Sequence, residues 1–269
     1  MIGEYTVKIG NKLFDYTNVN DIPEEFDHLI KFVPKAPPEP HTQKDHDYIN
    51  TFPTTGNLED DIAKVAQVDW IIEVVIERLD IKQKVFENLE KHRTPGTLIT
   101  SNTSGIPIGF MSEGRSEDFQ AHFCGTHFFN PPRYLKLFEI IPGPKTKPEV
   151  LEFFSTYAEQ FLGKTTVIAK DTPAFIGNRI GIFSIMSLFH TVKQMGLTIE
   201  EVDKLSGPVI GRPKSATFRT VDLVGLDTLV HVANGIRENC PGDERLELFE
   251  LPDFIGTMMD NKWLGSKTG

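Results

Sequence analysis

The sequence predicts an α/β fold followed by an all-helical region. Between residues 57 and 170, short β-prone segments alternate with amphipathic helical segments, which is typical of a parallel sheet covered by helices. After residue 171 the strand signals end, and residues 175–195 have the apolar periodicity of one long helix that ends at Gly196. The first 52 residues resemble neither pattern. We therefore expect three parts, at residues 1–52, 53–170 and 171–269.

The composition indicates a soluble globular protein. The chain of 269 residues is 39% hydrophobic and 25% charged, and its net charge of −10 argues against nucleic acid or an anionic membrane as a partner. Cys124 and Cys240 form no CxxC pair, so the sequence suggests no metal site or disulfide framework. No apolar run approaches the roughly 20 residues of a membrane-spanning helix, and no signal peptide is recognisable. We expect a cytoplasmic protein.

The N-terminal part is expected to hold a short hairpin followed by a linker. Residues 4–9 and 12–16 alternate apolar and polar side chains, and Gly10-Asn11 between them suits a tight turn. Residues 33–40 are rich in proline, which favours an extended backbone.

From residue 57 onward the expected elements follow in regular order, with Asn57 as a candidate helix cap. They are a helix over 58–66, a buried strand over 68–76, a helix over 80–92, a strand over 97–100, a short helix over 106–111, strands near 121–128 and 135–141, a helix over 148–162 and a strand over 165–169.

Two groups of polar residues lie near the ends of predicted strands. Ser101-Asn-Thr-Ser104 follows the strand 97–100, at the position where open parallel sheets bind ligands, although such a turn can equally cap the next helix. Glu73, Glu77 and Lys82 lie in or just after the strand 68–76. They could belong to a cofactor site or to a solvated loop.

The strongest chemical signal is a histidine and a glutamate twelve residues apart. His127 ends one β-prone run and Glu139 begins the next. An imidazole held by a carboxylate is the usual base near neutral pH. A histidine between aromatic residues is by itself more often structural, and Glu139 could face solvent on an edge strand. The presence of the carboxylate together with Asn130 favours a functional constellation.

The segment from Asp171 to Arg179 opens the helical part. Asp171 or Thr172 is a candidate helix cap, with Pro173 at the first helical position. Asn178 is then expected to point from the first turns of the helix toward the cleft between the two parts.

Taken together, these motifs resemble the 3-hydroxyacyl-CoA dehydrogenases, especially the dehydrogenase part of the larger bacterial multidomain forms. The resemblance covers about residues 55–269, and its pieces occur in order with family-like spacing. They are Ile71–Glu77, Ser101–Ser104, Thr126–Pro131, Leu135–Glu139, Asp171–Arg179, Val224–Asp227 and Leu264–Gly269.

The resemblance implies an incomplete Rossmann-like sheet and a specific reaction. The reaction is the NAD-dependent oxidation of (3S)-3-hydroxyacyl-CoA to 3-oxoacyl-CoA in fatty-acid β-oxidation. His127 is implied as the general base, supported by Glu139. The implied residues are His127, Glu139, Ser104 and Asn178 for catalysis, Glu77, Lys82, Asn102 and Ser104 for NAD, and Ser104, Asn130 and Asn178 for the acyl-CoA substrate.

One feature of the family is missing from the sequence. The family's NAD domain begins with a βαβ unit whose Gly-x-Gly-x-x-Gly turn binds pyrophosphate, and residues 1–52 contain no such turn. A second hypothesis is therefore a non-catalytic acyl-CoA-binding or assembly module that has lost NAD binding. A third is a related dehydrogenase that acts on a different hydroxy acid. By analogy with relatives, the apolar segments 175–195 and 220–235 are candidates for a homodimer contact.

Overall fold

The chain divides into two compact units, Met1–Asp61 and Ile62–Gly269. The computed structural model describes residues 2–9, 12–18, 21–23, 28–34, 58 and 60–268. In the first unit, β1 (Ile2–Ile9) pairs antiparallel with β2 (Lys12–Asn18) and with β3 (His28–Pro34). The two predicted strands are confirmed. The third was not predicted, because it runs into the proline-rich stretch; the turn at residues 10–11 and residues 35–50 lie outside the described residues.

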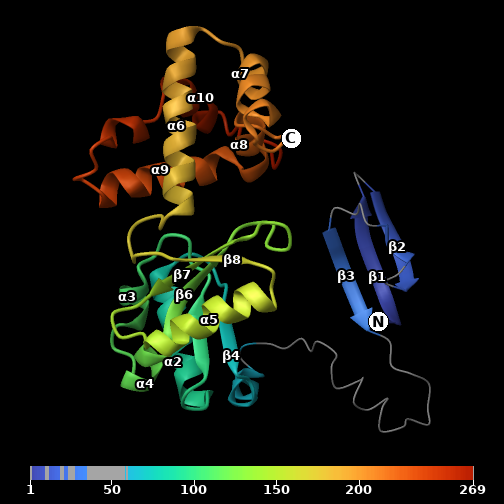
Figure 1. The fold of residues 1–269 in the computed structure, drawn as a ribbon, viewed down its shortest axis with the longest axis vertical. Coiled ribbons are helices and arrows are strands. Elements are labelled where there is room, and N and C mark those ends of the chain that lie inside the picture. Colours follow the sequence, from blue (N-terminus) through green and yellow to red (C-terminus); the bar gives the residue numbers. More distant parts are fainter. Residues whose placement is uncertain are drawn as a thin grey trace. The chain divides into compact units, whose positions relative to one another are not determined.

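The second unit contains a five-stranded sheet with the order β4-β5-β6-β7-β8 (Figure 1). Its strands are β4 (Trp70–Glu73), β5 (Leu98–Ser101), β6 (Phe123–Phe128), β7 (Leu137–Pro142) and β8 (Thr165–Ile168). The α/β class is confirmed, and β4, β5 and β6 are parallel as expected. However, β7 is antiparallel to β6 and parallel to β8. The connection over residues 129–136 is too short for a parallel crossover, which needs about a dozen residues or more.

The antiparallel hairpin of β6 and β7 sets the register of the site. His127 and Glu139 are direct partners across the two strands. Residues directly opposite in an antiparallel pair point to the same face, with Cβ atoms roughly 4.5–5.5 Å apart. The twelve-residue spacing in the sequence therefore becomes a side-by-side pair in the fold.

Helices cover both faces of this sheet. They are α2 (Leu79–His92), α3 (Ile108–Ser112), α4 (Glu117–Ala121) and α5 (Pro148–Gln160), and a 3-10 helix, η2 (Ile62–Gln67), stands where the helix 58–66 was predicted. Phe86 of α2 and Phe119 of α4 pack with Phe123 on one face. On the other face, Phe154 of α5 packs with Phe138. Asn57, the predicted cap, lies outside the described residues.

The first strand of this sheet is shorter and less buried than predicted. It ends at Glu73, and the side chains of Val74 and Ile76 beyond it are 66% and 63% exposed. The expectation of a strand buried on both faces over residues 68–76 is therefore wrong for its second half. An apolar run alone does not distinguish a central strand from β4, which lies at one end of the strand order.

The helical half follows the sheet within the same unit. It consists of α6 (Gly177–Met195), α7 (Ile199–Ser206), η3 (Pro208–Ile210), α8 (Phe218–Val224), α9 (Leu226–Asn239), η4 (Leu246–Phe249) and α10 (Asp253–Asp260). Its core joins Met186 and Phe189 of α6 to Ala233 of α9 and Ile255 of α10. None of the helices in the described ranges combines the length and apolar character needed to cross a membrane.

The long helix α6 starts later than predicted. Ala174 and Phe175 have φ angles of 62° and 48°, and this left-handed backbone delays the start of the helix to Gly177. The prediction that Asp171 or Thr172 caps this helix is therefore wrong. Its end is confirmed, because Gly196 adopts the left-handed conformation with a φ of 65°. The N-terminal end of α6, drawn in gold in Figure 1, meets the α/β half.

Candidate functional site

The centre of the site is a hydrogen bond between His127 and Glu139. The Nδ1 atom of His127 lies 2.6 Å from Oε2 of Glu139. The histidine is 5% exposed, and the glutamate is completely buried on a strand between β6 and β8. The alternative of a solvent-facing Glu139 on an edge strand is therefore wrong.

The second carboxylate oxygen of Glu139 holds the start of α6. Its Oε1 accepts hydrogen bonds from the backbone N–H groups of Ile176 at 2.9 Å and Gly177 at 2.7 Å. A carboxylate is favoured there, because the first N–H groups of a helix are unpaired and carry the positive end of its dipole. One side chain thus links the imidazole on β6 to the first helix of the helical half.

Glu139 remains ionised at neutral pH. Burial alone would raise the pKa of this carboxyl, but the hydrogen bond from His127 and those from the start of α6 outweigh burial and hold the pKa below its ordinary value of 4.5. An ionised carboxylate only accepts hydrogen bonds, so Nδ1 of the imidazole must carry the hydrogen. In neutral His127 the lone pair is then on Nε2, which makes no hydrogen bond to any described residue. This nitrogen can take a proton.

Aromatic rings fix the plane of the imidazole. The ring of Phe129 lies 4.4 Å from that of His127, and Phe175 lies 5.7 Å away, both measured between ring centroids. Phe129 in turn packs against Gly177. A Cβ atom built on Gly177 would lie 2.5 Å from Phe129 Cζ and 3.1 Å from Leu137 Cδ2. The absence of a side chain at the first residue of α6 is therefore required for this packing.

Gly177→Ala is expected to destabilise the protein and disturb the His127 ring. The added methyl group must displace the Phe129 ring, and such overpacking costs about 1–3 kcal/mol. The matched control is Gly181→Ala, one turn later in α6, where an added Cβ meets nothing within 4 Å. This control should be neutral or stabilising by up to about 1 kcal/mol. Thermal unfolding of both variants gives the comparison, and equal stabilities would contradict the packing argument.

A second polar cluster joins the ends of β4 and β5. Glu77 Oε1 accepts the Thr103 hydroxyl at 2.6 Å and the N–H groups of Ser104 and Gly105 at 2.9 and 3.1 Å. Its Oε2 lies 3.2 Å from Lys82 Nζ. Burial would raise the pKa of Glu77, but the Thr103 hydrogen bond and the Lys82 charge outweigh burial and lower this pKa. Glu77 is therefore anionic at the edge of the sheet.

Lys82 is buried behind Glu77 rather than exposed to the ligand space. Its side chain is 1% exposed, and its ammonium group contacts both Glu73 and Glu77 as well as the Val75 carbonyl oxygen at 3.3 Å. The ammonium group has three hydrogens; both oxygens of Glu73 and the Val75 carbonyl oxygen accept hydrogen bonds from it, and Glu77 is its second ion-pair partner. In this arrangement the charge of Lys82 reaches a ligand through Glu77.

A cleft of about 340 Å³ lies between the α/β half and α9. Glu77 and Ser104 line one wall, with Phe110 of α3, and His231 and Glu238 of α9 line the other. Small-molecule sites typically measure about 300–1,000 Å³, so this cleft is large enough for a small ligand or for one part of a larger one. The partly exposed carboxylate of Glu77 and the hydroxyl of Ser104 are polar groups on this wall of the cleft.

The other four candidates are not among the residues that line this cleft. His127 does not line this cleft, but Phe175, which contacts its ring, adjoins Ala174 in the lining. Asn178 is half-buried in the first turn of α6, and its side chain makes no hydrogen bond to any described residue. Asn130 is exposed, just after β6. Asn102 ties β5 to β6, because its Oδ1 accepts the Phe128 N–H at 2.9 Å.

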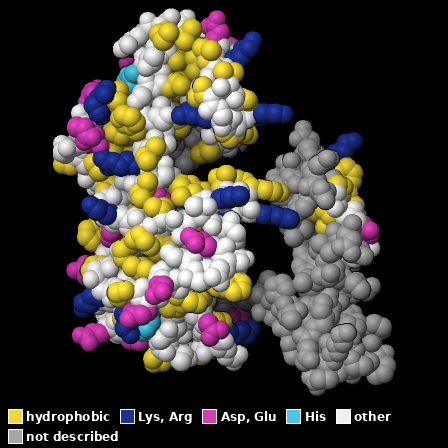
Figure 2. Space-filling view, viewed as in Figure 1, with side chains coloured by type: hydrophobic (Ala, Val, Ile, Leu, Met, Phe, Trp, Pro, Cys, Tyr) yellow, Lys and Arg dark blue, Asp and Glu magenta, His cyan; other side chains and the backbone are white. Residues whose placement is uncertain are grey.

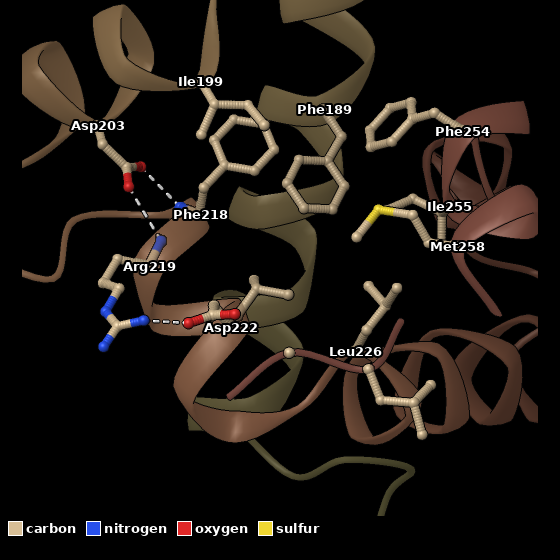
Figure 3. Close-up of a pocket in the computed structure, with 13 residues that line it drawn as sticks. Phe189, Ile199, Asp203, Phe218, Arg219, Asp222, Leu226, Phe254, Ile255 and Met258 are labelled. Carbon is tan, nitrogen blue, oxygen red and sulfur yellow. Dashed lines mark hydrogen bonds and ion pairs between the residues drawn. The ribbon is translucent and has the colours of Figure 1, made fainter. Parts of the chain in front are cut away.

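A second pocket, of about 320 Å³, lies inside the helical half (Figure 3). Phe189, Phe254 and Met258 give it an apolar lining. Its charged side chains are paired: Asp203 accepts the N–H groups of Phe218 and Arg219, and the Arg219 guanidinium bonds to Asp222. Among its described lining residues there is no histidine, cysteine or lysine.

Sequence comparison assigns both halves of the second unit. Residues 38–172 match the family model described as "3-hydroxyacyl-CoA dehydrogenase, NAD binding domain", and residues 175–269 match "3-hydroxyacyl-CoA dehydrogenase, C-terminal domain". The chain belongs to the 3-hydroxyacyl-CoA dehydrogenase family. Residues 38–172 correspond to the NAD-binding domain of this family, so the cofactor is NAD.

Individual relatives agree with this family. The chain is 51% identical over 241 residues to a probable 3-hydroxyacyl-CoA dehydrogenase of Bacillus subtilis, which covers 89% of this chain and 30% of that protein. It is 50% identical over 214 residues to a protein of the same name from Deinococcus radiodurans, covering 80% and 61%. The chain thus spans less than two thirds of either relative.

A solved structure gives the same fold. The crystal structure of (S)-3-hydroxybutyryl-CoA dehydrogenase from Ralstonia eutropha aligns with a TM-score of 0.69 and 26% identity. The alignment covers 77% of this chain and 71% of that one. The mixed sheet and the helical half are therefore the fold of this dehydrogenase family.

Two parts of the site were not identified from the sequence. Asp171 caps α3, because its two carboxylate oxygens accept the N–H groups of Ile108 and Gly109, both at 2.9 Å. The α9 wall of the cleft was also missed, since His231 and Glu238 lie on a helix with no distinctive motif. The position of Asp171 beside Thr172 and Pro173 correctly suggested a helix cap. The sequence indicated that it caps α6, whereas it caps α3.

Proposed function

We propose that this chain catalyses the NAD-dependent oxidation of (3S)-3-hydroxyacyl-CoA to 3-oxoacyl-CoA, a step of fatty-acid β-oxidation. The observation that carries the proposal is the His127–Glu139 pair, which leaves one imidazole nitrogen free to accept a proton. The names of the bacterial relatives support the substrate class, and the (S)-specific name of the Ralstonia eutropha structure supports the stereochemistry.

In the proposed reaction, Nε2 of His127 removes the proton of the 3-hydroxyl group. The buried carboxylate of Glu139 then stabilises the imidazolium ion that forms. Ser104 and Asn178 would hydrogen-bond the reacting oxygen and position the 3-carbon, and Asn130 would contact the acyl-CoA. No described residue hydrogen-bonds the Asn178 side chain, which supports this assignment.

NAD, when bound, supplies the acceptor for the hydrogen that leaves carbon 3 as hydride. Ser104 and the anionic Glu77, with Lys82 behind it, would hold the nicotinamide ribose in the 340 Å³ cleft. Asn102 uses its oxygen within the protein and retains its amide N–H₂ group for the cofactor. The residues present therefore fit the nicotinamide end of NAD.

The exposed apolar side chains of α6 support a homodimer formed through the helical half. Ile180 and Met195 are each 64% exposed, and Figure 2 shows hydrophobic side chains gathered on this half of the second unit. Exposed apolar surface commonly marks a protein interface.

The test is a titration of the purified chain with NADH and acetoacetyl-CoA, followed by absorbance at the nicotinamide band. We expect NADH to be oxidised when acetoacetyl-CoA is also present, and to remain unchanged without it. Binding of the CoA ester without binding of NADH would contradict the proposal and would favour a non-catalytic acyl-CoA-binding module. Light scattering on the same sample is expected to give twice the mass of one chain.

A further inference from the structure

The buried carboxylate of Glu73 lies at the end of β4, directly behind the cleft residues. It is 3% exposed, and it accepts four hydrogen bonds from three donors, Lys82, Val75 and Ser101. Oε1 is 2.9 Å from Lys82 Nζ and accepts the Val75 N–H at 2.5 Å. Oε2 accepts the Ser101 hydroxyl at 2.6 Å and is 3.1 Å from the same ammonium group. Because four hydrogen bonds fill its lone pairs and almost none of its surface is exposed, Glu73 does not itself contact a ligand.

Lys82 connects this buried carboxylate to the one that lines the cleft. Its ammonium nitrogen is 2.9 Å from Glu73 and 3.2 Å from Glu77. The two carboxylates thus share one positive charge, and the cluster has a net charge of −1. Because Glu73 holds part of the ammonium charge, Glu77 retains negative charge on the side that faces the cleft.

Glu73 also fixes the strand that carries the hydroxyl-rich turn. Its bond to Ser101 joins the end of β4 to the end of β5, and the Ser101 oxygen also accepts the Thr103 N–H at 3.2 Å. Thr103 and Ser104 are two of the donors to Glu77. The contacts therefore form a closed loop from Glu73 through Lys82, Glu77 and the turn back to Glu73.

We infer that Glu73 is a positioning residue for the nicotinamide-ribose end of the cleft. It acts through Lys82 and Ser101 to hold Glu77 and Ser104 in the places from which they contact the cofactor. This inference rests on the proposed function for the identity of the ligand, and on the hydrogen-bond loop for the role of Glu73.

The test variant is Glu73→Gln, which keeps the shape of the side chain and removes its charge. Lys82 then has one carboxylate partner instead of two and draws Glu77 inward. The Kd for NADH, measured by fluorescence titration, is expected to rise about ten-fold, while the KM for acetoacetyl-CoA stays within about two-fold. A purely structural role would instead lower the active fraction and leave both constants unchanged, which would overturn the inference.

A second readout requires neither NADH nor turnover. Hydrogen exchange of the ligand-free protein reports on the N–H groups of Ser104 and Gly105, which Glu77 accepts. In Glu73→Gln these amides are expected to exchange faster, while peptides from α6 to α10 are unchanged. Unchanged exchange at Ser104 and Gly105 would refute the positioning role of Glu73. Failure of the wild-type chain to bind NADH would instead count against the proposed function alone, and the exchange measurement would still test the positioning role.

Two further variants complete the experiment. Glu90→Gln removes a carboxylate that likewise accepts a backbone N–H, from Ser116, and pairs with Arg115; it should leave the Ser104 and Gly105 amides unaffected. Lys82→Met combined with Glu73→Gln should weaken NADH binding by less than the sum of the two single losses, because Glu73 acts in part through that lysine. Additive losses would contradict this. If Glu73→Gln does not fold, Ser101→Ala removes one bond of the loop and should accelerate the same two amides.

Discussion

Replacing His127 with asparagine is expected to reduce kcat for acetoacetyl-CoA reduction by about 10²- to 10⁴-fold, the usual contribution of a general acid–base group. Asparagine can still donate a hydrogen bond toward Glu139, so the carboxylate keeps a partner and the hairpin keeps its register. Because only the proton-transfer group is lost, the Kd for acetoacetyl-CoA should change less than about two-fold. Steady-state kinetics and calorimetric titration measure the two quantities.

The control for this variant is His122→Asn. His122 follows α4, and its Nδ1 hydrogen-bonds the Asp118 carbonyl oxygen at 2.7 Å. The same chemical change at this position should leave kcat within about two-fold of the wild type. Normal turnover in His127→Asn would remove the proposed base and, with it, the mechanism.

Glu139→Gln is expected to reduce kcat by about 10³-fold, and for a different reason. The glutamine oxygen can still accept the N–H groups at the start of α6, which turns the amide nitrogen toward His127. Nδ1 must then accept a hydrogen bond, so the ring hydrogen moves to Nε2 and the free lone pair is lost. The nitrogen resonances of the imidazole would report this change of tautomer in the NMR spectrum.

The same variant should show a specific dependence of stability on pH. The pKa of Glu139 is lowered in the folded protein, so its contribution to the free energy of unfolding is fully present above the unfolded value near 4.5. It is lost as the pH falls below 4.5 and through the folded pKa. Glu139→Gln should therefore be less stable than the wild type at pH 7, by roughly 2–4 kcal/mol, and the gap should narrow in acid.

Urea unfolding at pH 7 and at pH 3.5 tests this sign. The control is Glu159→Gln, which removes an exposed carboxylate that accepts the Thr166 hydroxyl. That variant should differ from the wild type by less than about 1 kcal/mol. A gap for Glu139→Gln that widens in acid would show that the carboxylate is not held in its ionised form.

The sequence predicted the elements and the chemical pair well, because these depend on local patterns. The α/β segment, the helical half and the end of α6 at Gly196 follow from periodicity and from glycine. The His127–Glu139 contact depends on the antiparallel pairing of β6 with β7. The sequence predicted parallel strands, so this pairing was missed. The pair was expected from chemistry, and its geometry is explained by the hairpin.

Other features depend on contacts between segments that are distant in the sequence. Asp171 caps α3 across more than 60 residues, and no local pattern indicates which helix a carboxylate will reach. Lys82 was expected near the cofactor, and its burial between two glutamates is visible only in three dimensions. The left-handed residues Ala174 and Phe175 likewise carry no sequence signature, since neither is glycine or asparagine.

The two oxygens of Glu139 have a practical consequence for anyone dissecting this protein. Severing the polypeptide near residue 170, where its composition changes, would remove from one oxygen of this carboxylate both of its amide donors. In the sheet-bearing fragment the carboxylate would be anchored by His127 alone, so the orientation of the imidazole should be less well defined. Recombining the two fragments would be needed to restore it.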